Sequence, residues 1–188
     1  MQKIFLFGDS ITAGYYQQEI TDLLTAPIQK SLPNLEVVNA GIPGDTTVDG
    51  LARIERFILR YDPAYVTVFF GANDADLACP LSVADYQANL KAIISRIGWQ
   101  KVLLLSAPYT NQRDSQARLE RIKSFVDGAE AVALETGVHF INVLDEMMQL
   151  VDPQSLLQED GLHFSLEGYD FLAELILSGL KQIRREKE

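Results

Sequence analysis

The chain has 188 residues, of which 47% are hydrophobic and 22% are charged, and its formal net charge is −10. This length and composition are typical of one globular unit with a sizeable core, so residues 1–188 are expected to form a single domain. The negative charge disfavours nucleic acid and anionic membrane surfaces as partners, because their phosphate groups would be repelled.

Cysteine and hydropathy narrow the class of protein further. Cys79 is the only cysteine, which excludes an intrachain disulfide and a cluster of thiolate metal ligands. The apolar segment at residues 4–7 is too short for the core of a secretory signal. No stretch approaches the ~18 consecutive apolar residues that a membrane-spanning helix needs. We therefore expect a cytoplasmic protein that does not insert into membranes.

Short apolar runs alternate with helical patterns along the chain. The runs are rich in Val, Ile, Leu and Phe at successive positions, which is typical of strands buried on both faces of a parallel sheet. They lie at residues 4–7, 36–39, 65–70, 102–106 and 138–143. Helices are expected near residues 15–31, 46–60, 82–97, 112–136 and 165–185.

This alternation predicts an α/β fold, a doubly wound sandwich with right-handed crossovers. Ligands of such folds bind outside the carboxyl ends of the strands. The residues that follow the first four runs are rich in glycine and polar side chains, and they lie at 8–10, 40–46, 71–74 and 107–109. We expect these segments to share one edge of the sheet and to form the functional site.

The chain has two histidines, and they differ in setting. His139 lies within a predicted strand and is interpreted as a core or strand-end imidazole. His163 follows Asp160 by three residues, in a loop before the last predicted helix. On a turn, that spacing can place a carboxylate beside an imidazole nitrogen, where it orients the ring and stabilises its protonated form. The alternative for this pair is a helix-capping aspartate beside a surface histidine.

Ser10 comes directly after the first run, between Gly8 and Gly14. A serine hydroxyl is a weak nucleophile that needs an adjacent base, and the alternative for Ser10 is a helix N-cap. Acyl transfer also needs hydrogen-bond donors for the developing oxyanion. Three candidate donors are the backbone N–H groups of Ser10 and Gly44 and the side-chain amide of Asn73. The alternative for Gly44 and Asn73 is an ordinary turn residue, because glycine and asparagine are both common in turns.

Several other chemistries are disfavoured. The sequence lacks the Gly-x-Ser-x-Gly nucleophile elbow, the phosphate loop Gly-x-x-x-x-Gly-Lys and the dinucleotide fingerprint Gly-x-Gly-x-x-Gly. No cluster of histidines and acids has the spacing of a tight metal site, so neither a metal nor a cofactor is expected. A hard-cation site is a weak alternative, formed by Asp9, Asp45, Asp74 and Asp76. Two other functions remain possible from the residues alone: an anion-binding module and a non-catalytic interaction protein.

Four separated blocks resemble the SGNH hydrolases, also called GDSL lipases or esterases. They occur in the family's order and span most of the chain: GDSITAGY at 8–15, NAGIPGDT at 39–46, GAND at 71–74 and DGLH at 160–163. The segments at 70–75 and 89–91 also look like the branch that hydrolyses small acetate esters such as isoamyl acetate. The short length is equally similar to bacterial thioesterase and lysophospholipase members.

The resemblance implies a flavodoxin-like three-layer sandwich, whose five-stranded parallel sheet has the order 2-1-3-4-5 and helices on both faces. It implies Ser10 as nucleophile, His163 as base and Asp160 as orienting acid. It also implies an oxyanion hole formed by Ser10, Gly44 and Asn73. Gly44 is preferred to Gly41 because Asp-Thr follows it, as in the family's block.

The predicted activity is that of a serine ester hydrolase, with a small-molecule ester as substrate and an acyl-enzyme intermediate. Connections between the predicted elements are mostly short and leave no long apolar lid, so short to medium acyl chains are expected. Loops expected to border the cleft carry Tyr15, Tyr16, Cys79, Tyr109 and Phe164, the last standing where many family members have proline. Thioesterase, lysophospholipase and sugar O-deacetylase activity remain alternatives, and the oligomeric state is open.

Overall fold

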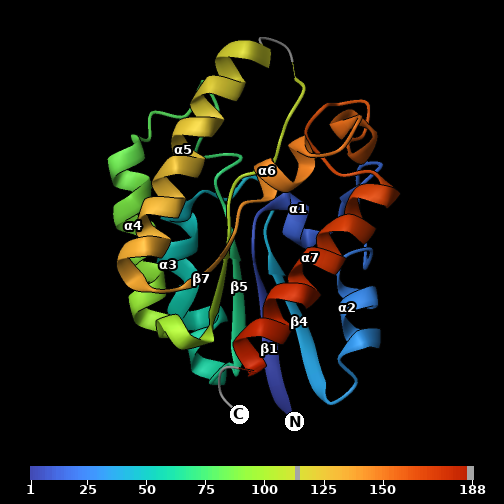
Figure 1. Ribbon diagram of the computed structural model, residues 1–188. Helices are drawn as coiled ribbons and strands as arrows, with labels where there is room; N and C mark the ends of the chain where they lie inside the picture. Colours follow the sequence, from blue (N-terminus) through green and yellow to red (C-terminus); the bar gives the residue numbers. More distant parts are fainter. Residues whose placement is uncertain (113–114, 186–188) are drawn as a thin grey trace.

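The computed structural model describes residues 1–112 and 115–185. Within these ranges, five parallel strands form one sheet in the order β4-β1-β5-β6-β7 (Figure 1). Their bounds are Gln2–Gly8 for β1, Leu35–Gly41 for β4, Tyr65–Phe69 for β5, Val102–Leu105 for β6 and His139–Ile141 for β7. Counted within this sheet, the order is the expected 2-1-3-4-5. The labels differ from that series because β2 and β3 form a separate small hairpin.

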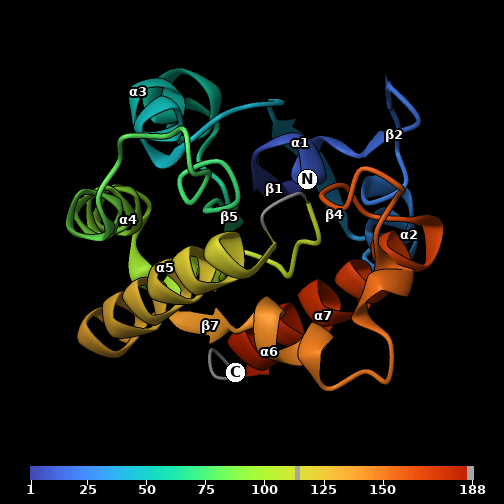
Figure 2. The same ribbon diagram turned by 90° about the horizontal axis from the view of Figure 1, so that it is seen from above.

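Helices cover both faces of the sheet, as Figures 1 and 2 show from two directions. One face carries α3 (Thr47–Phe57), α4 (Val83–Ile97) and α5 (Ser115–Thr136), and the other carries α2 (Thr25–Ser31) and α7 (Leu166–Arg185). Along β1, Phe5 and Phe7 pack toward the first group, whereas Ile4 and Leu6 pack toward the second. Burial on both faces explains why this strand is apolar at successive positions. The predicted three-layer α/β fold is therefore confirmed.

The predicted helix at 15–31 is wrong in its first half. A short helix, α1 (Ser10–Ala13), ends at Gly14, whose φ of 82° is left-handed. The chain then forms the antiparallel pair β2 (Tyr15–Tyr16) and β3 (Glu19–Ile20). The turn between them places Gln17 and Gln18 at φ values of 48° and 69°, which no right-handed helix contains. Only α2 remains of the predicted helix.

The other boundaries shift less. The last predicted strand is shortened because Asn142 caps a further helix, α6 (Val143–Met148), by accepting a hydrogen bond from Asp145 N. The helix predicted at 112–136 begins at Ser115, and positions 113 and 114 of that prediction lie outside the described residues. The 3₁₀ turns are η1 (Leu59–Tyr61), η2 (Trp99–Lys101) and η3 (Pro153–Leu156).

The carboxyl ends of three neighbouring strands meet at one edge of the sheet. Gly8, the last residue of β1, is in register with Gly41 of β4 and with Phe69 of β5. The segments that follow these strands therefore start side by side, as the sequence predicted for the functional site. None of the helices in the described ranges is both long enough and apolar enough to span a membrane.

Candidate active site

Ser10 is the first residue of α1, and Asp9 before it is the helix N-cap. The Asp9 carboxylate accepts a hydrogen bond from Ile11 N at 2.9 Å. Because the aspartate provides the cap, the alternative interpretation of Ser10 as an N-cap is wrong. The serine hydroxyl is left to make a different contact.

That contact is with His163, although the two residues lie 153 positions apart in the chain. Ser10 Oγ is 2.9 Å from His163 Nε2, and His163 Nδ1 is 2.6 Å from Asp160 Oδ2. The other carboxylate oxygen of Asp160 accepts from the backbone N–H groups of Leu162 and His163, each at 2.9 Å. Hydroxyl, imidazole and carboxylate thus form an unbroken chain of hydrogen bonds. Such a chain lets the ring accept a proton from the serine while the acid stabilises the resulting cation.

The charge state of Asp160 suits that arrangement. Burial raises the pKa of Asp160, but hydrogen bonds from the His163 ring and from the backbone of Leu162 and His163 outweigh burial and hold the pKa below its usual value. Asp160 is therefore ionised at neutral pH. Its side chain is 46% exposed, against 16% for His163, so the carboxylate faces both the ring and the solvent.

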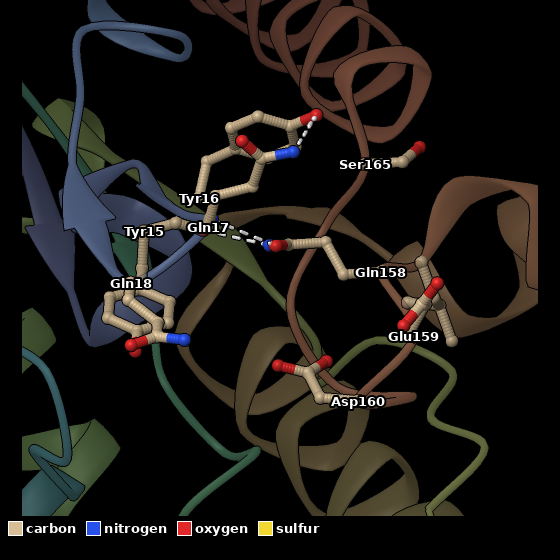
Figure 3. Close-up of a pocket in the computed structure, with 9 residues that line it drawn as sticks. Tyr15, Tyr16, Gln17, Gln18, Gln158, Glu159, Asp160 and Ser165 are labelled. Atoms are coloured by element: carbon tan, nitrogen blue, oxygen red, sulfur yellow. Dashed lines mark hydrogen bonds between the residues drawn. The ribbon is translucent and has the colours of Figure 1, made fainter.

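A hairpin and a glutamine hold this turn in place. The ring of Tyr15 lies against the His163 ring, with centroids 4.3 Å apart. Gln158 Nε2 donates to the carbonyls of Tyr15 (3.1 Å) and Phe164 (3.0 Å), while its Oε1 accepts from Gln17 N (3.0 Å), as Figure 3 shows in part. The Gln158 backbone also donates to the His163 carbonyl at 2.7 Å. One side chain therefore joins the β2–β3 hairpin to the segment that carries the acid and the imidazole.

Gly44 and Gly41 occupy very different surroundings. Gly41 N donates to Asn39 Oδ1 at 2.9 Å, and a Cβ at Gly41 would lie 2.3 Å from Ala13 N. Gly44 has a left-handed φ of 83°, and a Cβ there would meet no atom of the described residues within 4 Å. The N–H of Gly41 is thus already used inside the fold, whereas Gly44 faces open space. This difference favours Gly44 over Gly41 as a donor to a ligand.

Asn73 extends from the loop after β5 toward the loop after β4. Its Nδ2 donates to the carbonyl of Asp45 at 2.9 Å and lies 3.4 Å from Asp9 Oδ2. The neighbouring Asp74 carboxylate accepts from both the backbone N–H and the hydroxyl of Thr47, the first residue of α3. These contacts tie the Asn73 loop to the segment that contains Gly44.

The carboxyls of Asp9 and Asp74 are buried near Ser10. Burial, together with the charge of Asp74, raises the pKa of Asp9 to about 7, although the Ile11 N–H opposes the shift. Burial likewise raises the pKa of Asp74, against the hydrogen bonds from Thr47. Asp74 Oδ2 has no hydrogen-bond partner among the described residues. Both carboxyls therefore bind a proton more readily than an exposed aspartate does.

The expected cleft residues lie in different places. Tyr15 and Tyr16 line a pocket of about 500 Å³ beside Asp160 (Figure 3). Its other lining residues are Gln17, Gln18, Leu157, Gln158, Glu159, Asp160 and Ser165. Tyr109 lines a different pocket of about 350 Å³ next to α5. Cys79 is half-buried in the loop after Asn73. The prediction that Phe164 lines the cleft is wrong, because its side chain is fully buried in the core and packs on Tyr169.

The acidic residues considered for a hard cation have other partners. Asp45 pairs with Arg53, Asp74 with Thr47 and Asp76 with Arg118. In the part of the chain that the structure describes, no group of three or more His, Cys, Asp and Glu side chains is placed to hold a metal ion.

A serine, an imidazole and a carboxylate in hydrogen-bonding sequence, at the carboxyl edge of a parallel sheet, are the arrangement found in serine hydrolases. The model described as the GDSL-like lipase/acylhydrolase family matches residues 6–171, and the chain belongs to this family. It is therefore a carboxylic ester hydrolase of the GDSL type.

Individual relatives agree with this membership. A solved lipase/acylhydrolase from Enterococcus faecalis is 39% identical, covers 97% of this chain and 96% of its own, and superimposes with a TM-score of 0.91. Esterase TesA from Pseudomonas aeruginosa is 30% identical, over 97% of this chain and 89% of its own. The human isoamyl acetate-hydrolyzing esterase 1 homolog is 29% identical, over 90% of this chain and 77% of its own.

Sequence reasoning missed residues that support the site. Gln158 and Arg53 carry no motif of their own, and their importance comes from contacts with segments far away in the chain. A weak signal for Gln158 is its place two positions before the candidate acid Asp160. A weak signal for Arg53 is its place on the inner face of an amphipathic helix.

Proposed function

We propose that this protein hydrolyses carboxylic esters with Ser10 as nucleophile, His163 as general base and Asp160 as the acid that orients the ring. The observation that carries the proposal is the chain of contacts from Ser10 Oγ through the imidazole to Asp160, with distances of 2.9 and 2.6 Å. A hydroxyl so placed can lose its proton to the ring as it attacks.

The reaction would proceed in two halves. Ser10 Oγ attacks the ester carbonyl carbon while His163 Nε2 takes the serine proton, and a tetrahedral oxyanion forms. When this intermediate collapses, the bond to the alcohol breaks and His163 returns the proton to the departing oxygen. A water molecule then attacks the acyl-enzyme, again losing a proton to His163, and the acid leaves as Ser10 recovers its hydrogen.

The oxyanion would be held by the backbone N–H groups of Ser10 and Gly44 and by the side chain of Asn73. Gly44 supports this role because its Cα borders open space. One N–H of Asn73 is engaged by the Asp45 carbonyl at 2.9 Å, which fixes the amide plane. The same Nδ2 atom lies 3.4 Å from Asp9 Oδ2, a long contact that a charged oxygen of the substrate would readily replace.

The substrates we propose are small esters with short to medium acyl chains. The pocket beside Asp160 has a volume of about 500 Å³, and its lining mixes apolar groups such as Leu157 with amide, carboxylate and hydroxyl groups, so it lacks the continuous apolar wall that a long acyl chain would favour. The human relative is named for isoamyl acetate, itself a small ester. The rate should fall steeply from acetate and butyrate to palmitate esters of p-nitrophenol, and a rate that rises with chain length would contradict this part of the proposal.

The decisive experiment compares Ser10→Ala with Ser31→Ala, an exposed serine on α2. Hydrolysis of p-nitrophenyl acetate and covalent labelling by a fluorophosphonate are measured on the purified proteins. Both signals should disappear in Ser10→Ala and stay at the wild-type level in Ser31→Ala. Wild-type activity in Ser10→Ala would refute the assignment of the nucleophile.

A further inference from the structure

Arg53 lies on α3 and has no part in the chemistry proposed above, yet its side chain is only 10% exposed and reaches the edge of the sheet. Its Nε donates to Asp45 Oδ2 at 2.6 Å. Its Nη1 donates to the Ala40 carbonyl at 2.9 Å, and its Nη2 donates to the Gly8 carbonyl at 3.0 Å. The guanidinium also packs over the Phe7 ring, 4.6 Å from its centroid.

The acceptors of these hydrogen bonds belong to the segments that build the site. Gly8 ends β1 and is two residues before Ser10, while Ala40 lies near the end of β4, on the path to Gly44. Asp45 follows Gly44 directly, and its carbonyl accepts from Asn73 Nδ2. A single guanidinium therefore connects the nucleophile segment with the segment that carries one proposed oxyanion donor and orients the other.

The chemistry of the contact requires an arginine. A guanidinium is planar and presents its N–H groups in a fixed fork, whereas a lysine ammonium is a compact point charge on a flexible stem. Asp45 is also only slightly exposed, so burial raises its pKa while the hydrogen bond and the charge of Arg53 lower it. Without Arg53, Asp45 would be left as a buried carboxyl without its cation, and the loop would have reason to rearrange.

We propose that Arg53 is a positioning residue that holds Gly44 and Asn73 at the place where the oxyanion of the substrate develops. This inference rests on the proposed function, since an oxyanion hole has meaning only for acyl transfer at Ser10. Donors that are already aimed at the developing charge lower the barrier without binding the ground state more tightly. Loss of Arg53 therefore acts on kcat, whereas KM stays nearly constant.

The test measures p-nitrophenyl acetate kinetics for Arg53→Met, Arg53→Lys and Asp45→Asn. Arg56→Met is the matched control, because Arg56 is an exposed arginine one turn further along the same helix. For Arg53→Met we expect kcat to fall about 10- to 100-fold with KM changed by no more than about threefold, since a displacement near 1 Å has effects of this size. Arg53→Lys should retain an intermediate kcat, and Arg56→Met should match the wild type.

A double-mutant cycle and an inhibitor separate positioning from general damage to the fold. The effects of Arg53→Met and Asp45→Asn on kcat should be less than additive, because both break the same contact. A trifluoromethyl ketone, which forms an oxyanion on Ser10, should lose affinity for Arg53→Met by the same factor as kcat/KM falls.

Opposite results would overturn the inference. These are a folded Arg53→Met protein with wild-type kcat, a loss confined to KM, or an unchanged affinity for the ketone. If Arg53→Met does not fold, the same comparisons are made with Arg53→Lys and Asp45→Asn. Failure of the proposed function itself looks different, because the wild type would then neither turn over the ester nor be labelled at Ser10.

Discussion

The two halves of the site are built in contrasting ways. One half consists of the loops that follow neighbouring strands, and it carries Ser10, Gly44 and Asn73. Buried polar groups surround it. The half that carries Asp160 and His163 is a turn between η3 and α7, with its carboxylate 46% exposed. Figure 2 shows this turn region beside α1 and the β2–β3 hairpin.

Different interactions position the functional groups in the two halves. On the sheet edge, strand register sets the backbone, and buried contacts of Asp74 and Arg53 set the loops. In the turn, the Asp160 carboxylate accepts backbone hydrogen bonds that fix the local conformation. Gln158 then connects this turn to the β2–β3 hairpin through its hydrogen bond to the Tyr15 carbonyl. The first half depends on burial and long-range packing, and the second depends on local hydrogen bonds to Asp160 together with the long-range hydrogen bonds of Gln158.

The largest effect should come from removing the group that joins the two halves. His163→Ala should lower kcat for p-nitrophenyl acetate by at least about 10⁴-fold, because no other base lies within hydrogen-bonding distance of Ser10 in the described residues. The double variant with Ser10→Ala should be no slower than the slower single variant, since the two residues act as a unit. If the losses of kcat in the two single variants multiplied in the double variant, Ser10 and His163 would not act as one catalytic unit.

A smaller loss is expected within the sheet-edge half. Asn73→Ala should lower kcat about 10²- to 10³-fold with little change in KM, because a donor to the oxyanion acts mainly in the transition state. Asn34→Ala, an exposed asparagine before β4, provides the control for ester kinetics. A rise in KM at constant kcat would instead make Asn73 a substrate-binding residue.

The turn half should be more tolerant. Gln158→Ala removes the hydrogen bonds to Tyr15, Gln17 and Phe164, and we expect kcat to fall about 10-fold because the imidazole is held less closely in place. Gln154→Ala, on the exposed side of η3, should leave the kinetics unchanged. Equal rates for these two variants would mean that the hairpin has no influence on His163.

A further effect concerns the free energy of unfolding rather than the catalytic rate. The pKa of Asp9 is raised from 3.8 to about 7, so between these values the folded protein binds the proton more strongly than the unfolded chain. The free energy of unfolding should therefore fall as the pH rises from about 4 to 7, by a contribution on the order of a few kcal/mol.

Asp9→Asn removes that proton equilibrium while keeping the shape of the side chain. Relative to the wild type, the variant should gain stability as the pH increases from 5 to 8, which urea unfolding at each pH can measure. A difference in unfolding free energy that does not vary with pH would show that Asp9 is not the titrating group.

Much of the architecture was predictable because its signals are local. The apolar runs 4–7 and 65–70 form β1 and β5, and the helix predicted at 82–97 begins where Ser82 caps α4, with Ser82 Oγ accepting from Asp85 N. The hairpin after α1 was missed, because the apolar pattern near residue 15 also suits a helix and only the left-handed turn at Gln17 and Gln18 decides between them. The burial of Phe164 was missed for a related reason, since its neighbour Tyr169 belongs to the next helix.

From the sequence alone we could predict the strands of the sheet, the edge at which the polar segments lie, and the serine, asparagine, aspartate and histidine of the candidate site. Periodicity and spacing report such features, because they depend on neighbours within a few residues. The folded structure was needed to show that Ser10 contacts His163 and that Gly44 is open while Gly41 is packed. It was also needed to show that Arg53 and Gln158 bind the segments of the site. These outcomes depend on distances between atoms whose residues are far apart in the chain, and such distances exist only once the sheet and its helices have come together.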